Sequence, residues 1–257
     1  KLPKRGRFRY GSGSTSSILG RFGKDYEGLI CKMQRGGQFA PLFLVWRKYL
    51  MTEFYLIRHG KTVFNQEGRF QGGKKDSALL KQSIEDAKKA GEYLKGTHFE
   101  AFFSSPMGRS KQTGKAVLEG MGLGDVSIGT IEGLREFDFG NWDGDLVSEH
   151  EKSSEFETFF KDPENFVPIE MQGEDYHQFV GRIQHAAEKI HLEHPNGKVL
   201  IFAHALVNTF LVKTLLGENL NKIRAEGLVD NTSLCILKTN DFADFKLKMW
   251  NNTDYLK

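Results

Sequence analysis

The sequence predicts an α/β fold, a three-layer sandwich in which helices cover both faces of a mainly parallel sheet. Two observations lead to this prediction. From Met51 onward, short apolar runs alternate with stretches of helical periodicity, and such alternation is typical of parallel sheets covered on both sides. The chain of 257 residues, 39% of them hydrophobic, is also long enough to bury a large core.

Three strands are predicted in the first half of this region. Residues 54–57 are a short apolar run that ends at Arg58, His59 and Gly60. A helix follows, and its apolar face consists of Ile84, Ala87, Gly91 and Leu94. Residues 101–104 form a second strand, and the next helix opens near Pro106, because proline is tolerated in a first helical turn. Residues 126–131 form a third strand.

The second half contains the clearest helix, residues 175–194. Its continuous apolar stripe consists of Tyr176, Phe179, Val180, Ile183, Ala187 and Ile190. Residues 198–203 are predicted to be a fully buried strand that ends at His204. A helix over 206–216 closes at Gly217, and strands over 234–237 and 245–249 complete the region. Ligands bind outside the carboxyl ends of such strands, so His59 and His204 are expected to meet there.

Charge separates residues 1–50 from the rest of the chain. They contain eleven Lys and Arg against Asp25 and Glu27, a net charge of +9, so the whole-chain value of +3 leaves −6 for residues 51–257. We expect no fold in this basic segment. It is a leader for organelle import, a basic interaction tail, or sequence translated upstream of a start at Met51. We favour the last, because a strand begins just after Met51, and we expect 51–257 to be the catalytic domain.

Composition disfavours several functional classes. An acidic body argues against a nucleic-acid partner, because phosphate backbones are held chiefly by Lys and Arg. No apolar run approaches the roughly 20 residues that span a membrane. The two cysteines, Cys31 and Cys235, allow neither a disulfide framework nor a zinc pattern. We therefore expect a cytoplasmic protein, with import into an organelle as the alternative if residues 1–50 are a genuine leader.

The turn after the first strand suits a phosphate group. Arg58 offers a planar fork of donors, and the neutral imidazole of His59 can attack phosphorus. Gly60 allows close backbone approach, and Thr62 and Asn65 add small polar side chains. Alone this is weak evidence, because a histidine after a strand is more often a structural hydrogen-bonding residue.

Two later segments strengthen the hypothesis. Ser104, Ser105 and Pro106 lead to Arg109, in the first turn of a helix whose N-terminal amides favour an anion. His204 follows an almost wholly apolar strand, where an unpaired polar side chain would be costly. Arg109 is thus a phosphate ligand or a solvated surface residue, and His204 a phosphate donor or a satisfied core histidine.

These segments, in this order, resemble the histidine phosphatase superfamily, also called the phosphoglycerate mutase family, over nearly all of residues 51–257. The resemblance implies that His59 carries the phosphoryl group as phosphohistidine and that Arg58, Arg109 and His204 complete its pocket. Asn65, six residues after the nucleophile, would contact the phosphate. Residues 68–72 and 173–174 also match. The substrate contacts predicted beside Asn65 are Thr62, Gln71, Gly72 and Ala205.

The resemblance also implies a proton donor. Residues 134–144 read Leu-Arg-Glu-Phe-Asp-Phe-Gly-Asn-Trp-Asp-Gly, which matches the family segment that carries the acid. Glu136 is therefore the predicted general acid, with Asp138 as a second candidate and a surface carboxylate as the alternative. A carboxyl group beside aromatic residues can have a raised pKa, as acid catalysis near neutrality requires. The departures from the family pattern are Ala205 and Ser83 in place of glycine and Asp175 in place of serine.

The predicted function is hydrolysis of a small-molecule phosphate monoester without metal or cofactor, because the arginines and His204 can neutralise the transferred group. A phosphoglycerate mutase-type transfer and a catalytically silent phospho-ligand-binding module are the alternatives.

Residues 140–175 hold eleven Asp and Glu but only Lys152 and Lys161, so we expect them to repel polyanions and to favour an uncharged or cationic leaving group. The aromatic residues of this segment either line an apolar pocket or pack in the core. They are Trp142, Phe156, Phe159 and Phe160. We expect a monomer or a homodimer.

Overall fold

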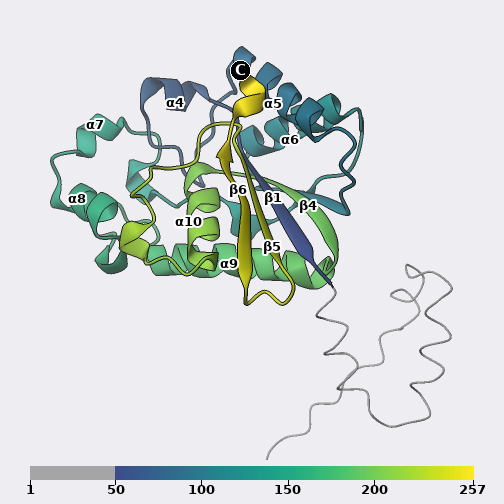
Figure 1. Ribbon diagram of the computed structural model, residues 1–257. Coiled ribbons are helices and arrows are strands. Elements are labelled where there is room, and N and C mark those ends of the chain that lie inside the picture. Colours follow the sequence, from purple (N-terminus) through teal and green to yellow (C-terminus); the bar gives the residue numbers. More distant parts are fainter. Residues whose placement is uncertain (1–49) are drawn as a thin grey trace, which may run out of the picture. The chain divides into compact units, whose positions relative to one another are not determined.

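The computed structural model describes residues 50–257 (Figure 1). Residues 1–49 lie outside the described residues. The predictions made for the segment 1–50 therefore lie outside them too, apart from Leu50. Within the described part, no helix is both long and apolar enough to cross a membrane.

Six strands form one sheet, in the order β3-β2-β4-β1-β5-β6. They are β1 (Thr52–Arg58), β2 (Ala101–Ser104), β3 (Gly129–Thr130), β4 (Gly197–Ala203), β5 (Leu234–Thr239) and β6 (Phe245–Asn252). The first four run parallel, whereas β5 is antiparallel to β1 and β6 is antiparallel to β5. The prediction of a mainly parallel sheet is confirmed. The strand predicted over 126–131 is wrong in length, because only two of its residues pair with β2 at the sheet edge.

Helices cover both faces of this sheet, which confirms the three-layer prediction (Figure 1). The residues of β1 alternate between the two cores, as a strand buried on both faces must. Phe54 and Leu56 pack in a core cluster with residues of α9 (Tyr176–Glu193) and α10 (Ala205–Leu215). Tyr55 and Ile57 pack in the other cluster, with residues of α5 (Lys81–Leu94) and α6 (Gly108–Met121).

The helices α5 and α6 approach each other closely through glycine. A Cβ on Gly91 would lie 2.1 Å from the carbonyl oxygen of Val117, so only glycine fits there. The predicted apolar face of α5 is confirmed at Ala87, Gly91 and Leu94. It is wrong at Ile84, which is 37% exposed, because the buried face at that turn is centred on Ser83.

The strands β1 and β4 end together. Arg58 lies opposite Ala203 in the parallel register, and the backbone N–H of His59 donates to the Ala203 carbonyl at 2.9 Å. His59 and His204 therefore leave the sheet at the same edge. Their rings are in contact, with centroids 5.2 Å apart and planes at 64°.

A long connection between β3 and α9 supplies one side of the site. It contains the short helices η2 (Glu132–Leu134), η3 (Gly140–Trp142), α7 (Val147–His150), α8 (Ser154–Lys161) and η4 (Pro163–Asn165). The carboxylate of Glu155 accepts bonds from the backbone N–H groups of Glu170 and Met171, at 2.6 and 2.9 Å. The Tyr176 hydroxyl donates to the Phe159 carbonyl at 3.0 Å. These bonds fix α8 against the body of the domain. The remaining short helices are α4 (Val63–Glu67), η5 (Leu220–Lys222) and η6 (Asp254–Leu256).

Candidate active site

His59 has the hydrogen bonding of a neutral nucleophile. Its Nδ1 lies 2.8 Å from the carbonyl oxygen of Gly60. A carbonyl can only accept, so Nδ1 carries the proton and Nε2 keeps its lone pair. Burial, and after it the positive charges of Arg109 and Arg58, lower the pKa of His59 well below the usual 6.5. The ring is therefore neutral near pH 7, with Nε2 as the atom able to attack.

His204 stands beside it as a second neutral imidazole. Its Nε2 is 2.7 Å from the Ser105 hydroxyl, and that hydroxyl can donate to it. Burial and the charge of Arg109 lower the pKa of His204 well below 6.5. The proton of the neutral ring can then lie on Nδ1, which is buried and has no hydrogen-bond partner among the described residues.

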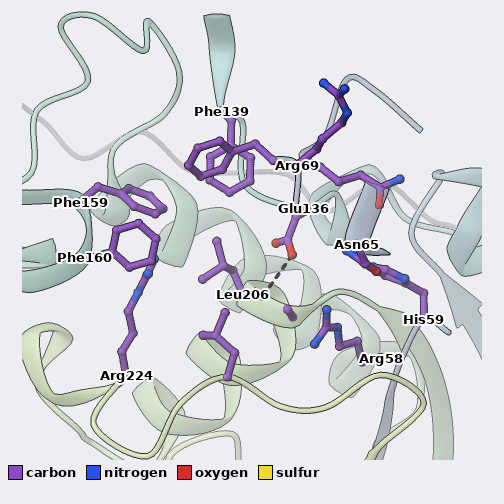
Figure 2. A pocket seen from close by; sticks show the side chains of 14 residues that line it. Arg58, His59, Asn65, Arg69, Glu136, Phe139, Phe159, Phe160, Leu206 and Arg224 are labelled. Atoms are coloured by element: carbon purple, nitrogen blue, oxygen red, sulfur yellow. Dashed lines mark hydrogen bonds between the residues drawn. The ribbon is translucent and has the colours of Figure 1, made fainter. Parts of the chain in front are cut away.

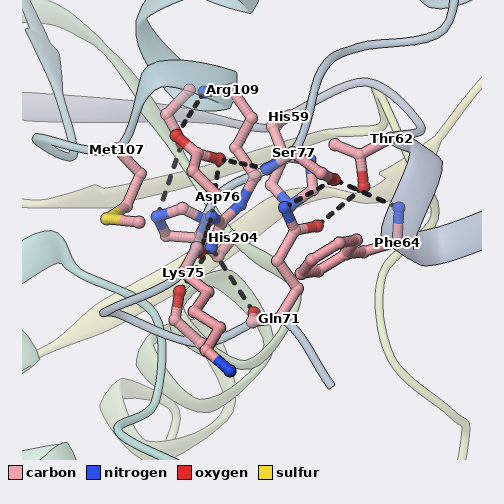
Figure 3. Close-up of polar contacts among 12 residues, drawn as sticks. His59, Thr62, Phe64, Gln71, Lys75, Asp76, Ser77, Met107, Arg109 and His204 are labelled. Atoms are coloured by element: carbon pink, nitrogen blue, oxygen red, sulfur yellow. Dashed lines mark hydrogen bonds and ion pairs between the residues drawn. The ribbon is translucent and has the colours of Figure 1, made fainter. Parts of the chain in front are cut away.

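Arg109 enters from the first turn of α6 and is 1% exposed. Its Nη1 donates to Asp76 at 2.9 Å and to the Lys75 carbonyl at 3.1 Å. Its Nη2 donates to the carbonyls of Gly72 at 2.8 Å and Gln71 at 3.4 Å (Figure 3). The guanidinium is thus held in one orientation by the loop 71–76. Arg109 is therefore not the solvated surface residue that was its alternative interpretation.

Three donors around His59 are buried without a partner in the described part of the chain. They are Nε of Arg58, Nε of Arg109 and Nδ1 of His204. Arg58 is held by a bond of 2.7 Å from Nη1 to the Val229 carbonyl. Buried donors without partners carry a free-energy penalty, which an anion with several acceptor oxygens removes.

Glu136 is a buried carboxyl group, 5% exposed, with both oxygens placed by backbone amides. Oε1 accepts from the N–H of Phe137 at 2.9 Å, and Oε2 accepts from the N–H of Leu206 at 3.1 Å (Figure 2). Burial raises the pKa of Glu136 above its usual 4.5, although those bonds and the charges of Arg109 and Arg58 oppose the shift. Raised pKa and fixed position suit a group that gives and takes a proton.

Arg58, His59 and Glu136 line a pocket of about 180 Å³. Six of the predicted site residues line it, namely Arg58, His59, Asn65, Gln71, Glu136 and Ala205. Four do not, namely Thr62, Gly72, Arg109 and His204. Figure 2 shows Arg58 and His59 at one end of the pocket, Glu136 in the middle, and Phe159, Phe160 and Arg224 at the other end.

Thr62 and Gly72 support the site, in contrast to their predicted contact with substrate. The Thr62 hydroxyl accepts from the N–H of Asn65 at 3.2 Å as the N-cap of α4, and donates to Gln71 at 2.7 Å (Figure 3). Gly72 donates its N–H to Asp143 at 2.8 Å. A Cβ on Gly72 would lie 2.5 Å from the Phe137 carbonyl oxygen. Both residues are needed because neighbouring chain segments pack against them.

The acids of segment 140–175 do not line the pocket. From this segment only Phe159 and Phe160 line the cavity. Some of its acids have partners outside the pocket: Asp143 accepts backbone N–H bonds from the loop 72–75, and Glu174 pairs with Arg182. The pocket itself has three arginines and one carboxyl group in its lining. The expectation of an uncharged or cationic leaving group, drawn from segment charge, is therefore wrong in its premise.

The aromatic residues of that segment divide between two environments. Phe159 and Phe160 line the pocket, whereas Trp142 and Phe156 do not. Trp142 is 3% exposed and packs on Phe70, with ring centroids 5.6 Å apart. One group of possible metal ligands, Asp145, Glu149 and His150, occurs among residues 50–257, and it also lies outside the pocket lining.

Sequence reasoning missed Asp76 and Arg224. Asp76 orients Arg109 through the ion pair of 2.9 Å. Arg224 lines the far end of the pocket from the loop between α10 and β5. Neither residue belongs to a recognisable motif. A lone acid in a turn and a lone arginine in a connecting loop give no signal until the chain is folded.

Known proteins resemble this chain in sequence and in fold. The family model described as "Histidine phosphatase superfamily (branch 1)" matches residues 54–253. Phosphoserine phosphatase 1 of Hydrogenobacter thermophilus is 27% identical over 202 residues, which are 77% of this chain and 92% of that protein. A 2,3-bisphosphoglycerate-dependent phosphoglycerate mutase of Parvibaculum lavamentivorans is 36% identical over 91 residues, 35% of this chain and 43% of that protein.

Among solved structures, Bacillus stearothermophilus YhfR superimposes with a TM-score of 0.73 at 27% identity, covering 80% of this chain and all of that one. The region that the family model matches, residues 54–253, contains every residue of the site described above. The chain belongs to the histidine phosphatase superfamily.

Proposed function

We propose that this chain is a phosphatase that hydrolyses a phosphate monoester through a phosphohistidine at His59 and needs no metal ion. The observation that carries the proposal is the set of partnerless buried donors around a neutral histidine, Arg58 Nε, Arg109 Nε and His204 Nδ1. A phosphoryl group has acceptor oxygens for all three donors. Positive charge fixed in this way stabilises the charge spread over those oxygens in the transition state.

In the first step, Nε2 of His59 attacks phosphorus in line with the leaving oxygen. The bond from phosphorus to the ester oxygen breaks, and its electron pair stays on that oxygen. The oxygen takes the proton of Glu136, and the alcohol leaves. The raised pKa of Glu136 keeps a larger fraction of this carboxyl group protonated than in an ordinary glutamate.

In the second step, the Glu136 carboxylate removes a proton from water, and the water oxygen attacks phosphorus. The bond between phosphorus and nitrogen breaks, its electron pair returns to Nε2, and inorganic phosphate leaves. One carboxyl group serves both steps because the leaving oxygen and the entering water occupy the same side of phosphorus, opposite His59. Its two backbone bonds hold it in place throughout.

Screening a panel of phosphate esters tests the proposal. We expect turnover to proceed with chelator present and to be inhibited by vanadate, a phosphate analogue. Stoichiometric phosphoenzyme, formed and then lost to water, is the expected course. Delivery of the phosphoryl group to a second hydroxyl instead of water would identify a mutase. Tight binding of phosphate esters without any phosphoenzyme would identify a silent binding module.

The proposal extends to partner, assembly and compartment. We expect the substrate to be a small-molecule phosphate ester, because the pocket of about 180 Å³ has room for a small leaving group. We expect a monomer or a homodimer in the cytoplasm. Size-exclusion chromatography with light scattering measures the assembly state, and microscopy of the tagged full-length chain shows the compartment.

A further inference from the structure

The far end of the pocket contains a cation that the proposed chemistry does not use. Arg224 lines the same cavity as His59 and Glu136. Figure 2 shows it beside Phe159 and Phe160, across the pocket from Arg58. Its guanidinium carbon lies 4.5 Å from the ring centroid of Phe159 and 4.7 Å from that of Phe160. Tyr176 and Phe210 follow at 5.5 and 5.7 Å.

The guanidinium of Arg224 has more donors than partners. A guanidinium has five N–H groups. Among the described residues, the Tyr176 hydroxyl is its one hydrogen-bond partner, and its Nε is buried with none. No described carboxylate forms an ion pair with it, in contrast to Arg109, which pairs with Asp76. Burial lowers the pKa of Arg224 from its usual value, which is the electrostatic sign of a desolvated cation without sufficient compensation.

Aromatic packing explains where the side chain lies but leaves these donors unsatisfied. Cation–π contacts use the faces of the guanidinium plane, whereas its N–H groups point outward in that plane. A fork of free N–H donors at a pocket wall matches the two oxygens of a carboxylate. We therefore propose that Arg224 binds a carboxylate carried by the leaving group of the substrate.

The size of the charge favours a carboxylate over a second phosphate. At the His59 end, two guanidinium groups and an imidazole are gathered for a phosphoryl group. At the other end a single guanidinium stands among aromatic rings, which matches a planar group with one negative charge. Glu136 lies between the two ends, and from there toward Arg224 the lining includes the apolar side chain of Leu206 (Figure 2). The substrate class is a phosphate monoester whose leaving group has an apolar part beyond the ester oxygen and a terminal carboxylate.

This inference rests on the proposed function only in placing the phosphate at His59. It is tested by binding, with probes that cannot be hydrolysed. The matched probes are 4-carboxybenzylphosphonate and its carboxamide, together with the corresponding pair substituted at position 3. Calorimetry should show at least one carboxylate bound on the order of 10-fold more tightly than its amide, as expected for a charge-assisted bidentate bond.

Variants connect that preference to the residue. Arg224→Gln should bring the carboxylate-to-amide ratio close to one, and Arg224→Lys should retain part of it, because lysine keeps the charge but loses the fork. Lys222→Gln, an exposed cation in the same loop, should leave the ratio unchanged. Thermal unfolding shows whether each variant is folded, and the ratio in the unaltered protein tests the inference even if the variants are not.

Three results would overturn the inference. They are no preference for a carboxylate in either pair, no binding of any phosphonate, and tighter binding of a bisphosphonate, in which a second phosphonate replaces the carboxylate at position 4, than of 4-carboxybenzylphosphonate. Failure of the proposed function is separate. Carboxylate preference without turnover of any ester would remove the phosphatase and keep Arg224 in its role, whereas turnover without preference would do the reverse.

Discussion

The two ends of the pocket are built in different ways. At the phosphoryl end, His59 and His204 follow strand ends and Arg109 lies in the first turn of a helix, and backbone groups orient the side chains, including that of Glu136 from the long connection between β3 and α9. Examples are His59 on the Gly60 carbonyl and Glu136 on two backbone amides. At the far end, Arg224 comes from a connecting loop and is positioned by aromatic side chains from α8, α9 and α10. The backbone thus positions the side chains at the phosphoryl end, whereas side-chain packing positions the residue that we propose binds the leaving group.

The largest expected effect is at the phosphoryl end. His59→Ala removes the attacking nitrogen, so turnover should fall by a factor on the order of 10,000 or more, as when a nucleophile is deleted elsewhere. The measurement is single-turnover release of phosphate. His98→Ala, at a histidine whose side chain is 87% exposed, is the matched control and should keep full activity. Substantial turnover by folded His59→Ala would place the nucleophile elsewhere.

A smaller and more selective loss is expected at Glu136. Glu136→Gln should slow alkyl phosphates by roughly 100-fold to 10,000-fold, the usual contribution of a positioned acid. An activated aryl phosphate, whose leaving oxygen needs little protonation, should be slowed much less in its first step and should accumulate phosphoenzyme. Rates for both ester classes give the comparison. Equal slowing without phosphoenzyme would exclude Glu136, and Asp138→Asn would then be the next variant to measure.

The contrast between the two ends also appears in what the sequence predicts. Helix periodicity and buried strands place His59 and His204 at one sheet edge, because parallel strands bring their carboxyl ends together. The residues Arg58, Arg109 and Glu136 are recognisable from their motifs. Arg224 is not, because its position depends on where α8 packs. Net charge of the segment 140–175 also misleads, since none of its acids lines the cavity.

Buried neutral histidines should make stability depend on pH. Lowered pKa values in the folded state mean that, below about pH 6.5, the unfolded chain binds protons that folded His59 and His204 do not. Each can then lower the free energy of unfolding by up to about 1.4 kcal/mol per pH unit as pH falls. The full contribution of each neutral histidine to the free energy of unfolding is present above pH 6.5. The raised pKa of Glu136 acts in the opposite direction above its ordinary 4.5.

Urea unfolding between pH 5 and 7 measures this slope. His59→Asn should reduce it by about 1.4 kcal/mol per pH unit at most, and His98→Asn should not change it. An unchanged slope in folded His59→Asn would mean that His59 titrates normally in the native protein and is not held neutral by its surroundings.

The smallest expected effect is that of metal removal. Because Arg58, Arg109 and His204 supply the donors for the phosphoryl oxygens, dialysis against chelator should change kcat/KM less than about twofold. Parallel assays with and without added magnesium provide the measurement. A rate that collapses in chelator and returns with magnesium would assign the charge neutralisation to a metal ion.

The central claim is the covalent intermediate on His59, and rapid quenching tests it most directly. An activated aryl phosphate mixed with enzyme should release a burst of phenol equal to the enzyme concentration. Base-stable, acid-labile phosphate should appear on the protein, and peptide mass spectrometry should place it on His59. Glu136→Gln should prolong its lifetime, because water then lacks its base. Linear phenol release with no phosphopeptide at His59, under conditions where turnover is seen, would contradict the account.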